Sequence, residues 1–118
     1  MKIAIRGVVE PGNLEKERLV LRAEVDTDVG RFLVARNAYV AEGSVSDEIK
    51  NAFWLPDQSV EAGNLVVLYT KSGENRIRVN KDESKTHFLY LGLEQPIWSS
   101  DDATVLIEIA TWQMKKVS

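Results

Sequence analysis

The stretch A-G-N-L-V-V-L-Y-T, residues 62–70, decides the fold class of this chain. A glycine turn opens it, and the strand that follows places Leu65, Val67 and Tyr69 on one side and Val66 and Leu68 on the other. A strand that is apolar on both faces needs neighbouring strands and a covering layer. The stretch therefore marks the centre of a domain.

The flanking sequence is a series of two-residue alternations separated by turn clusters. Strands are predicted over residues 3–5, 19–25, 31–40, 76–80, 86–93 and 103–112, with turns at 10–13, 26–30 and 71–75. Residues 45–55 show no clear period and are interpreted as a loop that contains at most a turn of helix. No long helical period separates the strands, so we expect an all-β fold, a single antiparallel β-sandwich of about seven or eight strands over residues 1–118.

The two-residue alternation of apolar and polar residues also predicts which side chains form the core. The expected core residues are Ile5, Leu19, Leu21, Leu65, Val67, Phe88, Val105 and Ile107. A domain of 118 residues buries roughly 65% of its unfolded surface without a disulfide or a metal.

Composition narrows the classes of function. The chain has no cysteine, which fits a reducing compartment, and Arg6 interrupts the first apolar residues, which is unlike a signal peptide; a cytoplasmic protein is predicted. The net charge is −3 with both signs scattered, so neither nucleic acid nor a membrane is an expected partner.

Two segments of the chain resemble the lamin tail domain family. They are F-W-L-P-D-Q-S-V-E-A-G-N-L-V-V-L-Y-T (53–70) and I-W-S-S-D-D-A-T-V-L-I (97–107), which together cover roughly the C-terminal half. Pro56, Gly63, Trp98, Asp102 and Ala103 occupy places comparable to the turn and core residues of that family. The resemblance implies an immunoglobulin-like sandwich that acts as an interaction module without enzymatic activity.

Catalytic, metal and cofactor chemistry is not predicted. His87 is the only histidine. A triad could be drawn from it with Asp101 and either Ser99 or Ser100, but the chain lacks the G-x-S-x-G turn that would support such a triad. Asp101 and Asp102 are interpreted as turn and capping residues, since neighbouring strand residues point to opposite faces. No glycine-rich phosphate loop is present, so no cofactor is expected.

The predicted binding site is the segment 46–58, around two adjacent large aromatics. Core packing absorbs one of Phe53 and Trp54 more readily than both, and Asp57 and Gln58 follow as polar neighbours. We expect these four residues to bind a protein partner or to mediate self-association.

A second hypothesis, a carbohydrate- or small-ligand-binding module, stays open on the sequence alone. It would use Trp54, Tyr39 or Tyr90 as an aromatic platform beside the polar side chains of Asn37 and Gln58.

Overall fold

The structure is a computed structural model that describes residues 1–118, and it is built from strands. The strands are β1 (Ile3–Val9), β2 (Arg18–Ala23), β3 (Thr27–Asp28), β4 (Phe32–Ala41), β5 (Ser44–Trp54), β6 (Ser59–Val60), β7 (Leu65–Tyr69), β8 (Arg76–Val79), β9 (Lys85–Tyr90) and β10 (Asp102–Glu108). A single 3-10 turn, η1 (Val29–Arg31), is the only helical element, which confirms the all-β prediction. None of the helical segments has the length and hydrophobicity needed to cross a membrane.

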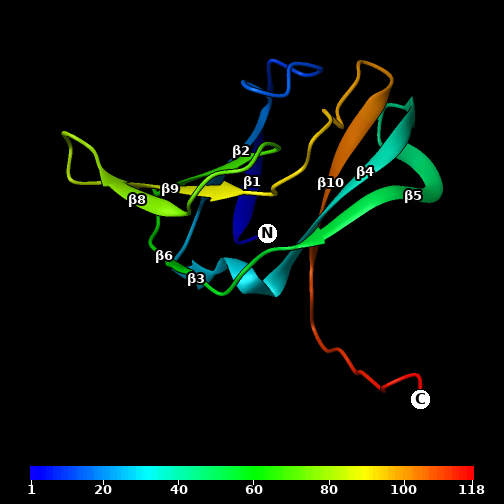
Figure 1. Cartoon of the computed structure of the whole chain (residues 1–118). Helices are drawn as coiled ribbons and strands as arrows, with labels where there is room; N and C mark the ends of the chain where they lie inside the picture. Colours follow the sequence, from blue (N-terminus) through cyan, green and yellow to red (C-terminus); the bar gives the residue numbers. More distant parts are fainter.

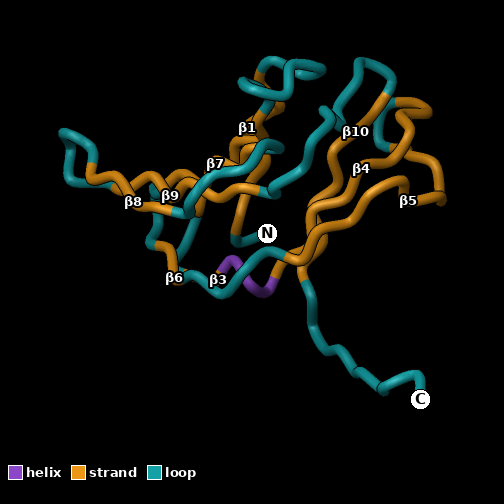
Figure 2. The backbone as a smooth tube through the Cα atoms, in the orientation of Figure 1, coloured by secondary structure: helices purple, strands orange, loops and turns teal.

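The strands form two main sheets and one short ribbon (Figure 1). The larger sheet has five strands in the order β1-β2-β7-β9-β8, the smaller has the order β10-β4-β5, and β3 pairs with β6. Residues 109–118 leave the smaller sheet as an extended segment without regular structure, which runs away from the body of the molecule (Figure 2).

One pair of neighbours is parallel, so the prediction of a wholly antiparallel arrangement is wrong. Strand β9 runs parallel to β7, with Leu65 beside Thr86 and Tyr69 beside Tyr90. Parallel neighbours need a crossover connection, and β8 supplies it: the chain goes out to the edge of the sheet as β8 and returns antiparallel to it as β9. The alternation of apolar residues does not encode which strand becomes a neighbour.

The core lies where the two main sheets face each other. It joins Ile3, Leu19, Leu21 and Val66 of the larger sheet to Phe32, Val34, Leu55 and Trp98. Of the predicted core residues, Leu19 and Leu21 belong to this core, whereas Val67 and Phe88 are buried on the opposite face of the larger sheet. The other four keep part of their surface exposed: Ile5, Leu65, Val105 and Ile107.

The prediction for β10 chose the wrong face of that strand. Leu106 packs against the core, whereas Val105 and Ile107 project from the opposite side of the sheet. Both faces of this strand carry apolar residues, and a period of two separates the faces without saying which is inside.

The expected loop over residues 45–55 is in fact β5, an edge strand of the smaller sheet. Most of its side chains are exposed, and its pairing with β4 shifts register between Arg36 and Asn37 and again on either side of Tyr39. Bulges of this kind remove the two-residue period that a strand prediction depends on. The segment therefore looks irregular in sequence although its backbone is paired.

Candidate functional site

Trp54 is the last residue of β5 and lies beside a second tryptophan from the other end of the chain. Its side chain is 48% exposed, and its Nε1 donates a 2.7 Å hydrogen bond to the carbonyl oxygen of Gly30. Trp112 packs edge to face against it, with ring centroids 5.0 Å apart and planes at 89°, and is 65% exposed. The edge-to-face arrangement is favourable for aromatic rings and leaves indole surface open to solvent.

The backbone around Gly30 is held in place by Asp28. One oxygen of this carboxylate, Oδ1, accepts from the backbone N–H of Gly30 at 2.7 Å and from that of Gln58 at 3.0 Å. Asp28 therefore caps η1 and ties it to the segment after β5. A Cβ at position 30 would lie 2.1 Å from Oδ1 of Asp57 and 3.0 Å from its Cα, so only glycine allows Asp57 to approach this closely.

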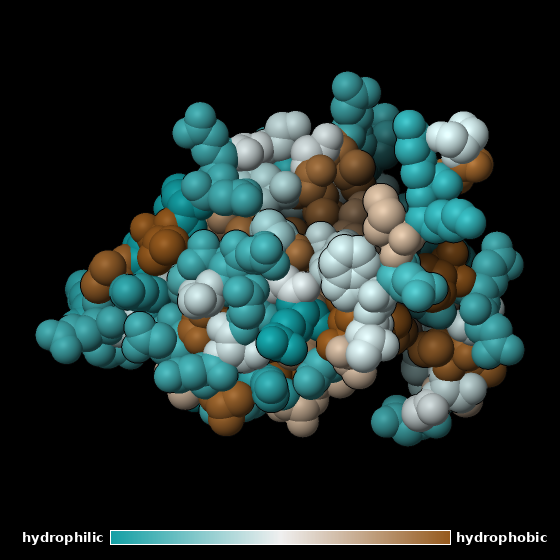
Figure 3. Space-filling view, turned by 90° about the horizontal axis from the view of Figure 1, so that it is seen from below, coloured by the Kyte–Doolittle hydropathy of each residue, from teal (hydrophilic) through white to brown (hydrophobic).

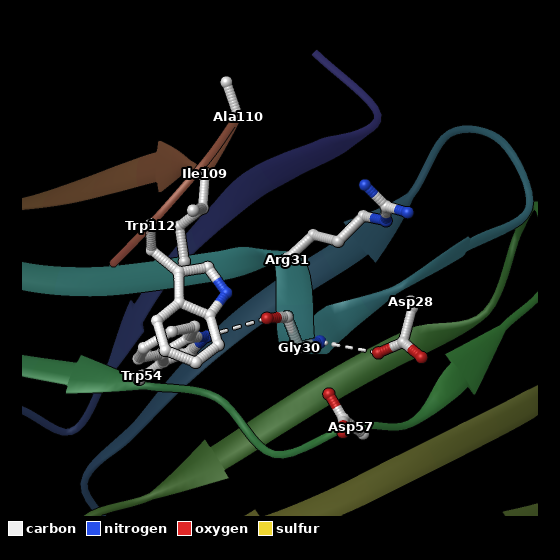
Figure 4. Close-up of a pocket in the computed structure, with 8 residues that line it drawn as sticks. All are labelled: Asp28, Gly30, Arg31, Trp54, Asp57, Ile109, Ala110 and Trp112. Atoms are coloured by element: carbon white, nitrogen blue, oxygen red, sulfur yellow. Dashed lines mark hydrogen bonds between the residues drawn. The ribbon is translucent and has the colours of Figure 1, made fainter. Parts of the chain in front are cut away.

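The two tryptophans border a groove with two halves, of which Figure 4 shows the polar one. The polar half encloses about 430 Å³, and its lining includes Asp28, Arg31 and Asp57. The apolar half encloses about 380 Å³, and its lining includes Leu33 and Ile107. Both halves share Trp54, Ile109, Ala110 and Trp112, and we call the whole the tryptophan groove.

The segment that carries Trp112 is anchored where it passes the groove. The backbone N–H of Ile109 donates a 2.7 Å hydrogen bond to the carbonyl oxygen of Arg31. This bond continues the pairing of β10 with the start of β4 by one residue and sets the position at which the extended segment leaves.

The structure brings two of the four predicted site residues to the groove. Trp54 and Asp57 line it. Phe53 pairs with Val34 and is half-buried on the opposite face of β5, because adjacent strand residues alternate. The side chain of Gln58 lines a separate hollow, and its Nε2 donates to the carbonyl oxygen of Ser59.

The residues of the alternative aromatic platform do not come together. Tyr39 is exposed near the tip of the β4–β5 hairpin, opposite Val45, whereas Trp54 is at the other end of that hairpin. Tyr90 belongs to the larger sheet, where it stacks on Tyr69. Asn37 is 5% exposed.

His87 is buried in the larger sheet rather than placed beside serine or aspartate. Its Nε2 donates to Oδ1 of Asn64 at 3.2 Å, and its Nδ1 has no hydrogen-bond partner. Burial lowers the pKa of His87 below its ordinary value of 6.5, and the charge of Lys85 lowers it further against the opposing effect of Glu61. The imidazole is therefore neutral in the folded protein at neutral pH.

Asp102, the first residue of β10, caps the turn that precedes this strand, as the sequence suggested. Its Oδ2 accepts from the backbone N–H and the hydroxyl of Ser99, both at 3.1 Å, and its Oδ1 accepts from Nζ of Lys50 at 2.9 Å. Burial raises the pKa of Asp102, but the bonds from Lys50 and Ser99 and the charge of Arg36 outweigh it, so the pKa lies below its ordinary value. No group of three or more His, Cys, Asp or Glu residues is placed to hold a metal ion.

Sequence reasoning missed half of the groove. Trp112 has no sequence signal that links it to Trp54, because their contact joins residues far apart in the chain. Asp28 and Gly30 were assigned to a turn, and their type is typical of a capped turn, but nothing in that pattern places Asp57 against Gly30.

Comparison with known proteins gives no family for this chain: no family model, no curated protein and no solved structure matches it.

Proposed function

We propose that the protein is a non-catalytic interaction module that binds a segment of another protein, or of a second copy of itself, in the tryptophan groove. One observation carries this proposal: Trp54 and Trp112 stand together and remain 48% and 65% exposed. Large aromatic side chains concentrate binding energy because they contribute a large contact area and lose few rotamers on binding.

The lining of the groove suggests the chemistry of the bound segment. Its apolar half fits an aliphatic or aromatic side chain, and in its polar half the two carboxylates of Asp28 and Asp57 outnumber the one cation, Arg31. A segment that places an apolar residue beside a lysine or arginine complements both halves. A second copy of this chain offers the same exposed indole rings, so self-association belongs to the proposal.

The face of the molecule seen from below supports a site for a short segment rather than a broad interface. In the view from below, hydrophobic residues form separate patches with hydrophilic residues between them (Figure 3). Obligate interfaces are larger and more continuously apolar.

The same proposal includes an immunoglobulin-like sandwich of the lamin tail type and a cytoplasmic location. In support, β2 pairs with β7 and β4 pairs with β10, as strands B and E and strands C and F do in immunoglobulin domains. Trp98, one of the residues that carry the resemblance, is buried in the core. The parallel β9 departs from that pattern. The absence of cysteine supports a reducing compartment.

The test selects peptides from a displayed library on the wild-type protein and then measures their affinity for variants. We expect the selected peptides to pair an apolar residue with a basic one. Trp54→Ala should weaken binding by about 30-fold, which corresponds to about 2 kcal/mol. The matched control is Tyr39→Ala, which removes an aromatic of similar exposure, 53%, far along the same hairpin. It should leave affinity unchanged.

Thermal melting and a second ligand class decide the other outcomes. Trp54→Ala should keep the melting temperature within a few degrees, because the side chain is half exposed. A collapse of the fold would make Trp54 a structural residue, and peptides that bind Trp54→Ala and the wild type equally would place the site elsewhere. Binding to a glycan array that depends on Trp54 would favour the carbohydrate hypothesis.

A further inference from the structure

One face of the larger sheet gathers positive charge that the composition of the chain does not predict. Five cations lie on it, and we call it the cationic face: Arg18, Arg22, Lys71, Arg76 and Arg78. They are five of the 15 lysines and arginines of a chain whose net charge is −3. Their concentration on one sheet therefore results from the fold.

The pairing register places these side chains on the outer face, away from the core. Arg18 is opposite Tyr69, and Arg76 is opposite Phe88. Paired residues project from the same face of a sheet, whereas the next residue along, Leu19, projects from the other face and is buried in the core.

Arginine side chains replace a covering layer on this face. The Cζ atoms of Arg76 and Arg78 lie 4.1 Å and 5.2 Å from the ring centroid of Phe88. Phe88 and Val67 are consequently only 6% and 7% exposed although they point outward. A guanidinium group that stacks on a ring is held in position and keeps N–H donors for an incoming acceptor.

Most of these cations have no carboxylate partner within the protein. Arg18, Arg76 and Arg78 form no ion pair, whereas Arg22 pairs with Glu24 at 2.7 Å. Lys71 has only a 3.8 Å contact with Glu15, whose side chain is 78% exposed. The face thus presents guanidinium groups that a ligand with several negative charges would neutralise.

A hollow at one end of the face adds to the positive lining. It encloses about 560 Å³, and Arg22, Arg78 and Lys81 line it together with Leu65 and Thr86. One carboxylate, that of Asp82, also lines this hollow, where it accepts from the backbone N–H and the hydroxyl of Ser84 at 3.0 Å and 2.6 Å. Cations therefore outnumber anions along the hollow.

The aromatic rings show which class of anion fits. Tyr69 stacks on Tyr90 with centroids 5.4 Å apart, and Arg18 and Lys71 lie over Tyr69 at 5.8 Å and 5.1 Å. Gly73 packs so closely on the ring of Tyr90 that a Cβ there would lie 2.4 Å from it. The ring faces are occupied, whereas proteins that bind single-stranded nucleic acid offer free ring faces to the bases.

We propose that the cationic face binds an acidic segment of a protein partner, a run rich in Asp and Glu whose carboxylates pair with the guanidinium groups. Arginine pairs with carboxylates through two parallel hydrogen bonds, which suits ligands whose charges are spaced along an extended chain. This surface is distinct from the tryptophan groove, and the proposal does not depend on the function of that groove.

The test measures fluorescence anisotropy of a short labelled peptide of alternating Glu and Ser at about 50 mM and about 200 mM salt. A Lys and Ser peptide and an oligothymidylate of equal length serve as comparison probes. The wild type should bind the acidic peptide, more weakly at high salt. The double variant Arg76→Gln, Arg78→Gln should bind it about tenfold more weakly, a loss of about 1.4 kcal/mol.

The matched control is Lys115→Gln, Lys116→Gln, which changes the net charge equally at exposed positions outside both sheets. It should bind as the wild type does. Equal losses in the two double variants, absence of binding at about 50 mM salt, or tighter binding of the oligothymidylate would each overturn the proposal. If the β8 double variant does not melt cooperatively, the single variant Arg18→Gln in β2 takes its place in the comparison. Unchanged binding of the acidic peptide to Arg18→Gln would also overturn the proposal.

Discussion

The replacement of Glu17 by glutamine tests how the loops of this protein are held together. Glu17 is completely buried and forms no ion pair with a lysine or arginine. Its carboxylate joins three separate segments of the chain by hydrogen bonds. Oε1 accepts from the N–H groups of Gly12 and Trp98 at 2.8 Å and 3.1 Å. Oε2 accepts from the hydroxyl of Thr70 at 2.5 Å and from the N–H of Ile97 at 3.0 Å.

The magnitude follows from these four bonds. In Glu17→Gln an NH2 group replaces one oxygen, so two donors lose their acceptor. Each hydrogen bond to a charged group contributes about 1.5–3 kcal/mol, which gives a loss of about 3–6 kcal/mol. The neutral amide also avoids the desolvation penalty of a buried charge, so we expect the lower end, about 3 kcal/mol, out of a total stability of about 5–15 kcal/mol.

The assay is thermal and urea unfolding followed by circular dichroism. At about 4 °C per kcal/mol for a domain of this size, the melting temperature should fall by about 12 °C. The control, Glu15→Gln, changes an exposed carboxylate two residues away and should shift it by less than about 2 °C. A fall of less than about 4 °C in Glu17→Gln would show that the buried carboxylate does not hold the loops, and would refute the reasoning.

Two further predictions concern the two faces of the larger sheet and its buried histidine. Val66→Asp should unfold the domain, because it places an unpaired carboxylate in the core at a loss of several kcal/mol. Val67→Asp places the carboxylate toward the cationic face, so circular dichroism should show that this variant stays folded. Equal unfolding of both variants would contradict the assignment of faces. The pKa of His87 is lower in the folded state than its unfolded value of 6.5. The contribution of this histidine to stability is therefore fully present above pH 6.5. It is lost as the pH falls toward the folded-state pKa, by at most about 1.4 kcal/mol per pH unit. Urea midpoints of the wild type should therefore fall between pH 7 and pH 5 more than those of His87→Leu, and parallel curves would exclude this histidine as the cause.

The sequence by itself determined the kind of local structure. Two-residue alternation and turn residues are local properties, so they predicted an all-β chain and the central strand at residues 65–69. Trp98 as a packing residue and Asp102 as a capping residue were also recognisable, because their residue types and the turn before the last strand are local features. Where bulges break the alternation, as along β5, the same logic failed.

The tertiary structure alone decided which residues meet and which face of a strand is inside. The parallel placement of β9, the pairing of Trp54 with Trp112 and the collection of arginines on one face all join segments that are distant in the chain. When a strand carries apolar residues on both sides, its alternation fits a core on either side. The packing of the sheets then decides which face is buried. Both candidate binding surfaces depend on that choice and are therefore properties of the fold rather than of any motif.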